Sequence, residues 1–131
     1  MKVYLLSREE REEVREFIWE QLRKEYIWPL KSPQTAPVFF VEKKDGKKWM
    51  VQDYRYLNKW IIKNNYPLLL ISDVLENIGI KKVFTKMDLR WGYNKVRIKK
   101  GDEWKAAFTT PEGSFKPMVM FFGLMNSPAM F

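Results

Sequence analysis

Between residues 7 and 26 the apolar side chains recur every three or four positions, which is the spacing of one face of an α-helix. They are Val14, Phe17, Ile18 and Leu22. Ser7 and Glu10 have the S-x-x-E spacing of a capping box, in which each side chain accepts a hydrogen bond from a backbone N–H at the helix start. The pattern predicts an amphipathic helix that packs against the rest of the domain.

The middle of the chain holds shorter apolar runs, separated by residues typical of turns. Two runs flank Asp45-Gly46, a dipeptide that favours a tight hairpin. Residues 82–88 place apolar side chains between charges, which predicts a strand. KAAFTT and FKPMVMFF predict two further strands, joined by the turn sequence of residues 111–114.

Two short helices are predicted in the second half of the chain. One covers residues 71–79, with Ser72 as a candidate N-cap and Gly79 at its C-terminal end. The other begins in NSPAMF, with Ser127 as the cap and Pro128 at the first helical position. Helices and strands in this order predict an α+β domain. Because the chain stops where the last helix starts, we expect a fragment of a longer protein.

Composition narrows the chemistry that the chain can perform. Its 131 residues fit one domain, and they include neither Cys nor His. Disulfides, thiol nucleophiles, His general bases and Cys or His zinc sites are therefore excluded. Carboxylates remain, and these bind hard cations such as magnesium.

Positive charge is concentrated in two blocks. Residues 42–63 carry 7 basic and 3 acidic side chains, and residues 81–105 carry 9 basic and 3 acidic ones. Basic blocks with interleaved aromatic residues favour a nucleic-acid partner, although a solvated surface without a partner fits equally well. The chain has no signal peptide and no apolar run long enough to span a bilayer, so we expect an intracellular protein that does not contact membranes.

Six motifs occur in an order and spacing that resemble the N-terminal part of a reverse transcriptase from gypsy-type LTR retrotransposons. They are SPQTAPVFFVEKKDG, VQDYRYLN, NNYPL, VFTKMDLRWGYNKVRI, KAAFTTPEGSF and FFGLMNSPAMF. The resemblance implies a truncated right-hand polymerase. Residues 1–24 are then a leading helix, residues from about 25 to 80 the fingers, and residues from about 81 to 131 the first part of the palm.

The resemblance also implies the chemistry, which in the intact family is RNA-directed DNA synthesis by nucleotidyl transfer. Asp88 is expected at the end of the first palm strand, as a catalytic carboxylate that binds Mg²⁺ together with the backbone of Leu89. Two metal ions in such a site stabilise the attacking and leaving oxygens. The alternative for Asp88 is a strand-end carboxylate that backbone donors satisfy.

Further residues match family positions around the nucleotide and the nucleic acid. Tyr93 matches the aromatic residue beneath the incoming sugar, and Phe122 matches a residue that lines the nucleotide pocket; core packing is the alternative for both. Lys43 matches a position that contacts the phosphates of the incoming dNTP. Positions near the template and primer are matched by Lys44, Lys47, Asp53 and Arg55. For Arg55 a structural ion pair is equally compatible, and the lysines could serve only to keep the hairpin tip soluble.

The sequence also departs from the family pattern. Trp49 stands at the nucleotide-binding position where the family usually has an Arg that reaches the triphosphate, and Trp91 and Glu25 replace a small residue and a Gly. The family's next motif, Y-x-D-D, is absent, as are the rest of the palm, the thumb, ribonuclease H and integrase. We therefore expect no polymerisation by this chain alone. The alternatives are a non-catalytic, basic nucleic-acid-binding remnant and a decayed pseudogene product.

Overall fold

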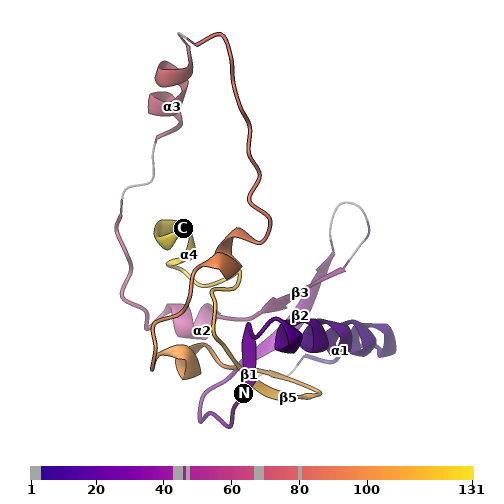
Figure 1. Ribbon diagram of the computed structural model, residues 1–131. Helices are drawn as coiled ribbons and strands as arrows, with labels where there is room; N and C mark the ends of the chain where they lie inside the picture. The colour runs from indigo at the N-terminus through magenta and orange to yellow at the C-terminus, as the bar shows by residue number, and fades with distance from the viewer. Residues whose placement is uncertain (1–3, 43–45, 47, 67–69, 80) are drawn as a thin grey trace.

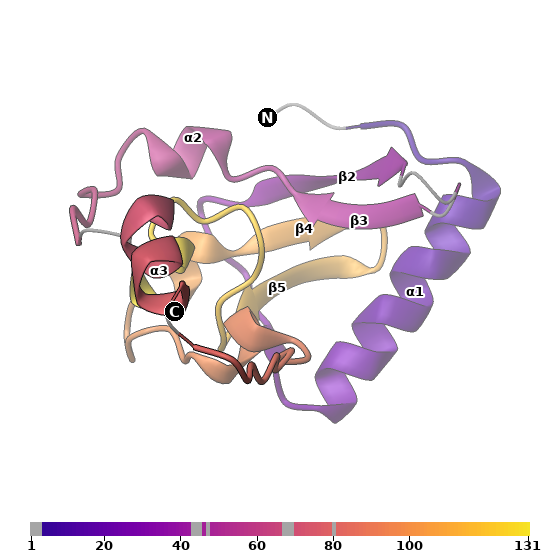
Figure 2. The ribbon, with the colours of Figure 1, turned by 90° about the horizontal axis from the view of Figure 1, so that it is seen from above.

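The computed structural model describes residues 4–42, 46, 48–66, 70–79 and 81–131. Its centre is a five-stranded sheet with the order β1-β5-β4-β2-β3 (Figure 2). The strands are β1 (Ile27–Pro29), β2 (Ala36–Glu42), β3 (Lys48–Gln52), β4 (Phe108–Thr110) and β5 (Gly113–Pro117). β2 and β4 run parallel, and the other neighbours are antiparallel. Together with a long helix against the sheet, this is the predicted α+β organisation.

The leading helix α1 (Arg8–Arg23) forms with the predicted capping box. The Glu10 backbone N–H donates to Ser7 Oγ at 3.2 Å, and the Ser7 N–H donates to Glu10 Oε2 at 2.8 Å. The prediction for Leu22 was wrong, because Leu22 is exposed and Gln21 is buried in its place. At 100° per residue Gln21 lies about 20° from the direction of Val14, whereas Leu22 has drifted by about 80°.

The predicted hairpin is confirmed. β2 and β3 pair in register from Val38 with Gln52 to Glu42 with Lys48. Gly46 has φ +77°, a left-handed conformation that suits glycine in a tight turn. Four hairpin-tip residues of the sequence prediction lie outside the described residues: Lys43, Lys44, Asp45 and Lys47.

The hydrophobic core lies between α1 and the sheet. It is built from Val14, Ile18, Ile27, Val38, Met50, Phe108, Phe115, Val119 and Phe121. Phe108 of the central strand β4 is completely buried, and its ring lies 6.0 Å from that of Phe115 on β5. Burial of apolar area is the dominant force that holds α1 on the sheet.

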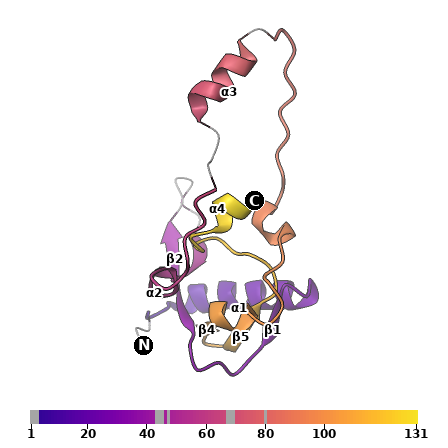
Figure 3. The same ribbon diagram turned by 90° about the vertical axis from the view of Figure 1, so that its left-hand side faces the viewer.

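The helix α3 (Ile71–Ile78) lies away from the sheet, beyond extended segments of the chain (Figures 1 and 3). The predicted helix is confirmed, but its N-cap is Leu70, and Ser72 lies in the first turn, where its hydroxyl donates to Asp73. Gly79 is the C-cap, as predicted. Every described side chain from residue 70 to residue 91 is exposed. We call residues 70–91 the arm.

The predicted strand over residues 82–88 does not form. This part of the arm is extended, but it pairs with no strand in the described part of the chain. A strand needs a neighbouring strand whose backbone forms hydrogen bonds with its N–H and C=O groups. The alternation of charged and apolar side chains in this segment does not provide such a neighbour. Asp88 therefore lies on an exposed, extended segment and not at a strand end.

Short elements complete the fold. They are α2 (Arg55–Asn58), η1 (Gly92–Lys95), η2 (Glu103–Ala106) and α4 (Ser127–Met130). The 3₁₀ helix η2 occupies the start of the predicted KAAFTT strand, so β4 is shorter than expected, and β5 ends before the predicted FKPMVMFF run does. In α4 the N-cap is Asn126 and Ser127 is already helical, one residue from the prediction. Across the described ranges, the helices lack the length and apolar character that a membrane span requires.

Candidate nucleotide and nucleic-acid site

Three aromatic side chains from separate parts of the chain meet on one side of the molecule. The rings of Tyr93 and Phe122 are 4.8 Å apart between centroids, and those of Trp49 and Phe122 are 5.1 Å apart. Both pairs have the edge-to-face geometry that aromatic quadrupoles favour. We call Trp49, Tyr93 and Phe122 the aromatic cluster. It contains all three described residues that the sequence assigned to the incoming nucleotide.

Gly92 and Phe131 support the cluster from the side of η1. The Phe131 ring lies 5.5 Å from that of Tyr93. It also lies so close to Gly92 that a Cβ added there would come within 2.6 Å of Phe131 Cζ. A glycine before Tyr93 thus lets the terminal ring approach the backbone.

A concavity of about 510 Å³ opens beside the cluster, between α1, the β2–β3 hairpin and the end of the arm. Its lining includes Phe17, Lys48, Leu89, Trp91 and Phe122. Trp91 adopts φ +56°, a left-handed conformation that non-glycine residues rarely take. The Lys24 ammonium lies 5.5 Å from the centre of the Trp91 ring, within cation–π range. Trp91, three positions after Asp88, is therefore held over the C-terminal end of α1.

Asp88 is one residue from this concavity, since its neighbour Leu89 lines the wall. The Asp88 side chain itself is exposed. Mg²⁺ requires near-octahedral oxygen coordination, commonly from more than one carboxylate together with substrate phosphates and water. Among the described residues no cluster of three or more acidic groups could hold a metal ion. These residues therefore do not make a complete metal site, and we assign no step to a metal on this chain.

Asp53 and Arg55 form a two-point ion pair where β3 meets α2. Arg55 donates from Nε to Asp53 Oδ1 at 2.8 Å and from Nη2 to Asp53 Oδ2 at 2.7 Å. The Tyr4 hydroxyl donates to Asp53 Oδ2 at 3.0 Å and accepts from Arg55 Nη2 at 2.9 Å. The Arg55 guanidinium holds the pKa of the Asp53 carboxyl far below its usual range. The structural ion pair that the sequence analysis gave as an alternative role for Arg55 is therefore present.

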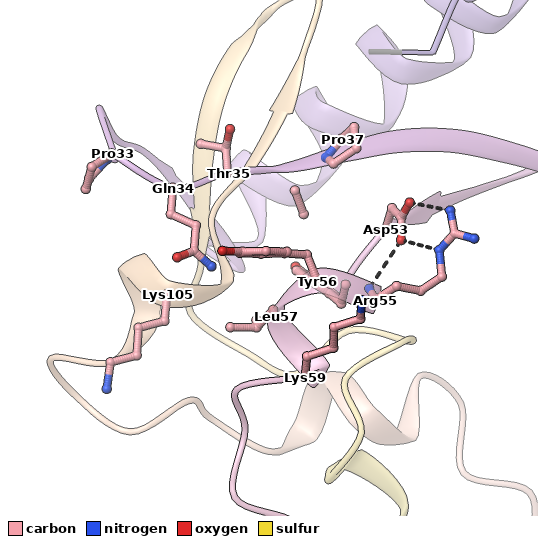
Figure 4. Close-up of a pocket in the computed structure, with 12 residues that line it drawn as sticks. Pro33, Gln34, Thr35, Pro37, Asp53, Arg55, Tyr56, Leu57, Lys59 and Lys105 are labelled. Carbon is pink, nitrogen blue, oxygen red and sulfur yellow. Dashed lines mark hydrogen bonds and ion pairs between the residues drawn. The ribbon is translucent and has the colours of Figure 1, made fainter. Parts of the chain in front are cut away.

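This ion pair lies at the edge of a second concavity, of about 580 Å³ (Figure 4). Tyr56 reaches across it toward Gln34, and Lys59 and Lys105 lie at its margin. Asp53 and Arg55, the two described residues assigned to the template, thus belong to a different surface from the aromatic cluster. The structure therefore brings together the described residues that were predicted to contact the nucleotide, and places Asp53 and Arg55, which were predicted to lie near the template, on another surface.

Two features of this surface were missed at the level of sequence. Tyr4 contacts a carboxylate 49 positions away, and no local pattern signals so distant a partner. Tyr56 and Trp60 are four positions apart in RYLNKW, which places two aromatic side chains on the same face of a helical turn, with Arg55 and Lys59 next to them in the sequence. This spacing could have been recognised from the sequence.

The likeness to known proteins extends over most of the chain. Residues 41–131 match the family described as reverse transcriptase (RNA-dependent DNA polymerase). Over 101 residues the chain is 46% identical to the Transposon Tf2-3 polyprotein of Schizosaccharomyces pombe, and equally to the Tf2-4 polyprotein of the same organism. The match covers 77% of this chain and 8% of each polyprotein, so the chain spans a small part of the length of these relatives.

Solved structures show the same fold. Prototype foamy virus protease–reverse transcriptase (CSH mutant) is 28% identical with a TM-score of 0.83, and the likeness covers 100% of this chain and 18% of that one. The foamy viral protease–reverse transcriptase in complex with dsDNA is 25% identical with a TM-score of 0.79, covering 100% of this chain and 28% of that one. The complex of that protein with an RNA/DNA hybrid gives a TM-score of 0.82 at 24% identity, over 99% of this chain and 18% of that one.

The resemblance to reverse transcriptases inferred from the six motifs is thereby confirmed, and the Schizosaccharomyces pombe relatives are transposon polyproteins. Strands β2 and β4 lie on these motifs, as do Tyr93 and Phe122 of the aromatic cluster. This chain belongs to the reverse transcriptase family.

Proposed function

We propose that this chain is the part of an RNA-directed DNA polymerase that faces the incoming nucleotide and the template. The observation that carries the proposal is the aromatic cluster, in which the β2–β3 hairpin, η1 and the segment after β5 converge. We assign residues 1–24 to a leading helix, residues from about 25 to 80 to the fingers and residues from about 81 to 131 to the palm. The nucleotide then lies where fingers and palm meet.

The exposure of the cluster supports this role over core packing. Phe122 is 43% exposed and Trp49 is 39% exposed, so both rings present area to a ligand. Tyr93 is less exposed and packs on Phe122 from the side of η1, which fixes its ring. We propose that Tyr93 contacts the sugar and that Phe122 lines the nucleotide pocket.

We propose Mg²⁺ as the ion of the whole polymerase, with Asp88 and the backbone of Leu89 as this chain's ligands. The further carboxylates would come from the rest of the polyprotein, which we expect to include the remaining palm, the thumb, ribonuclease H and integrase. One carboxylate cannot hold two magnesium ions in a defined geometry. We therefore propose that this chain alone does not polymerise DNA.

A template–primer and a dNTP are the proposed partners of the whole polymerase. The foamy viral relatives were solved with an RNA/DNA hybrid and with dsDNA, which supports the first of these. On the hairpin we propose that Lys43 contacts the phosphates of the nucleotide and that Lys44 and Lys47 contact template or primer. Lys48 is already engaged, because its ammonium donates to Glu10 Oε1 of α1 at 2.8 Å.

Trp49 favours a second candidate, a nucleic-acid-binding protein without catalysis. An indole has one N–H donor and no charge, whereas the family's guanidinium offers five donors. Here the Trp49 ring packs against Phe122 instead of carrying a charge toward a triphosphate. If this candidate is correct, the chain binds nucleic acid but never supports primer extension, even when the missing carboxylates are supplied.

Photocrosslinking tests the proposed nucleotide site directly. The full chain is irradiated with 8-azido-dATP in the presence of an RNA/DNA primer–template and Mg²⁺, and adducts are mapped by mass spectrometry. We expect adducts on peptides that contain Trp49, Tyr93 or Phe122, and we expect unlabelled dATP to suppress them. The double variant Tyr93→Ala/Phe122→Ala should lose them, whereas the exposed-aromatic control Trp19→Ala should not. Adducts that persist in the double variant, or that dATP does not suppress, refute the proposal.

A further inference from the structure

A third concavity, of about 750 Å³, lies between α2 with the turn after it, residues 96–106 and α4. None of the described residues assigned above to the nucleotide, the metal or the template lines it. Its volume falls within the range of about 300–1,000 Å³ that small-molecule sites occupy. We call it the α4 concavity. It is a separate hollow with room for a small organic ligand.

The walls of the α4 concavity are mostly apolar. Trp60 is 73% exposed and Trp104 is 41% exposed, so both rings present apolar area to solvent. Exposed apolar area gathered in one place marks sites that bind apolar ligands or partners. The aliphatic part of the lining includes Leu57, Ile61, Val96, Ile98, Met120 and Leu124. A ligand that fits these walls therefore has an apolar body.

Hydrogen bonds hold these walls in place. The Ile98 N–H donates to the Met118 carbonyl at 3.0 Å, which ties residues 96–98 to the segment after β5. Beside α4, the Asn126 side chain accepts from the Asn64 N–H at 3.0 Å and donates to the Ile62 carbonyl at 2.9 Å. The α4 concavity is therefore already formed without a ligand, which lowers the entropy cost of binding one.

Polar side chains near α4 are already engaged within the chain. Both polar atoms of the Asn126 amide are used in the bonds just described, and the Ser127 hydroxyl donates to the Phe121 carbonyl at 3.4 Å. Gln34 and Tyr56 lie on the side that is shared with the 580 Å³ concavity. A nucleobase or sugar buried against the apolar walls would lose hydrogen bonds to water without replacing them, which is costly. An aliphatic chain loses none.

Positive charge is the other property of the lining. It contains three cations, Arg97, Lys99 and Lys105, and one acid, Asp102, for a net charge of +2. Lys105 pairs with Asp102 at 2.5 Å, and Lys105 chiefly, with Lys99 as a weaker contributor, lowers the pKa of the Asp102 carboxyl. Arg97 takes part in none of the ion pairs found among the described residues. Its guanidinium is therefore free to bind an anionic group of a ligand.

We propose that the α4 concavity binds a free amphipathic carboxylate of the fatty-acid class, with its aliphatic chain on the apolar walls and its carboxylate at Arg97. A guanidinium binds a carboxylate through two parallel N–H···O bonds. Each methylene group removed from water adds to the affinity, so longer chains bind more tightly until the concavity is filled. The proposal goes beyond the proposed function and does not rest on it, because it requires neither nucleic acid nor a metal.

Isothermal titration of the full chain with sodium dodecanoate, below its micelle concentration and without nucleotide or nucleic acid, tests the proposal. We expect a single bound molecule per chain and a higher Tm in its presence, since a ligand of the native state stabilises that state. Decanoate is two methylenes shorter and should bind roughly tenfold more weakly. Dodecyltrimethylammonium has the same tail with a cationic head, and it should bind far more weakly because Arg97 repels it.

Variants locate the site. Arg97→Gln removes the charge at an exposed position and should weaken dodecanoate binding roughly tenfold or more, the loss expected for a charge-assisted hydrogen bond. Arg90→Gln, at an exposed position of the arm, is the matched control and should bind as the wild type does. Leu124→Trp places a larger side chain in the wall and should abolish binding. Thermal unfolding shows whether this variant folds, and Arg97→Gln tests the site whether it does or not.

The proposal is overturned if dodecanoate does not bind or lowers the Tm, if the cationic detergent binds equally well, or if chain length has no effect on affinity. It is also overturned if Arg90→Gln loses as much affinity as Arg97→Gln, or if a folded Leu124→Trp binds as the wild type does. None of these titrations contains a nucleotide, so their outcome is separate from that of the crosslinking experiment.

Discussion

The indole of Trp49 meets the ring of Phe122 edge to face, with 5.1 Å between the ring centroids and an interplanar angle of 81°. Trp49 comes from β3 and Phe122 from the segment after β5, so the contact joins the hairpin to the chain beside Tyr93. Position 49, where the family resemblance implies a cation, is here part of an aromatic wall. If the concavity holds a nucleotide as proposed, position 49 offers it a ring and no guanidinium.

Replacing Trp49 with Arg should restore affinity for a triphosphate. A charge-assisted hydrogen bond contributes about 1.5–3 kcal/mol, which corresponds to a roughly tenfold to hundredfold lower Kd. Isothermal titration of the full chain with dATP would measure it. Trp49→Leu is the control, since it removes the ring without adding charge and should gain nothing. Equal affinity of the Arg and Leu variants would show that position 49 does not face the phosphates.

Glu25→Gly should stabilise the chain by about 1 kcal/mol, because a non-glycine residue in the left-handed conformation costs about 1–2 kcal/mol. Glu25 has φ +56° at the end of α1. There the Tyr26 N–H donates to the Gln21 carbonyl and the Glu25 N–H to the Leu22 carbonyl, both at 3.0 Å, which is the helix-ending arrangement that glycine favours. Urea unfolding measures the change.

The control for this variant is Glu16→Gly, in the exposed middle of α1. The same substitution there should lower the free energy of unfolding by about 1 kcal/mol, because glycine in a helix interior is less favourable than other residues. If both variants destabilise the chain, the left-handed conformation of Glu25 is not the native one.

Asp53 should make the folded chain sensitive to acid. Its pKa is lowered from the ordinary value of 3.8, chiefly by the hydrogen bonds from Arg55. A lowered pKa means that the carboxylate stabilises the fold fully above pH 3.8, and that this stabilisation is lost as the pH falls further toward the folded-state pKa. Asp53→Asn should be less stable at neutral pH and should lose less stability below pH 4.

Thermal unfolding between pH 7 and pH 2 measures this difference. Arg55→Gln is the matched variant, since it keeps the carboxylate but removes the main cause of its lowered pKa, and its pH curve should also flatten. Parallel curves for the wild type and Asp53→Asn would contradict the role given to this ion pair.

The arm should contribute little to stability. Leu75 on α3 is exposed, as is every other described side chain from residue 70 to residue 91, so Leu75→Ala should change the free energy of unfolding by less than about 0.5 kcal/mol. Ile18→Ala in the core should cost about 2–5 kcal/mol. Urea unfolding of both variants measures these changes in the free energy of unfolding. A loss at Leu75 comparable to that at Ile18 would mean that α3 is buried in the folded chain.

Local signals explain what the sequence predicted correctly. The capping box of Ser7 and Glu10 and the hairpin of β2 and β3 depend on neighbours within a few residues, and both formed as expected. The contact between Tyr93 and Phe122 was not predicted: the family resemblance assigned both residues to the incoming nucleotide, but no pattern within either segment indicates that their rings touch. Their assigned roles remain proposals.

Long-range relations explain what the sequence did not predict. The strand over residues 82–88 depends on a neighbour that alternation cannot reveal, and the burial of Gln21 in place of Leu22 depends on the angle at which α1 meets the sheet. The bond between Tyr4 and Asp53 likewise requires the assembled fold. In each case the deciding partner lies far along the chain or belongs to another element.

Primer extension tests the proposed function most directly. In a chimera, the matching 101 residues of the Transposon Tf2-3 polyprotein are exchanged for those of this chain, and extension of a DNA primer on an RNA template is followed with Mg²⁺. We predict extension by the chimera, faster extension with Trp49→Arg, none with Asp88→Asn, and none by this chain alone. Extension that survives Asp88→Asn, product from this chain alone, or a chimera that stays inactive even with Trp49→Arg would contradict the proposal.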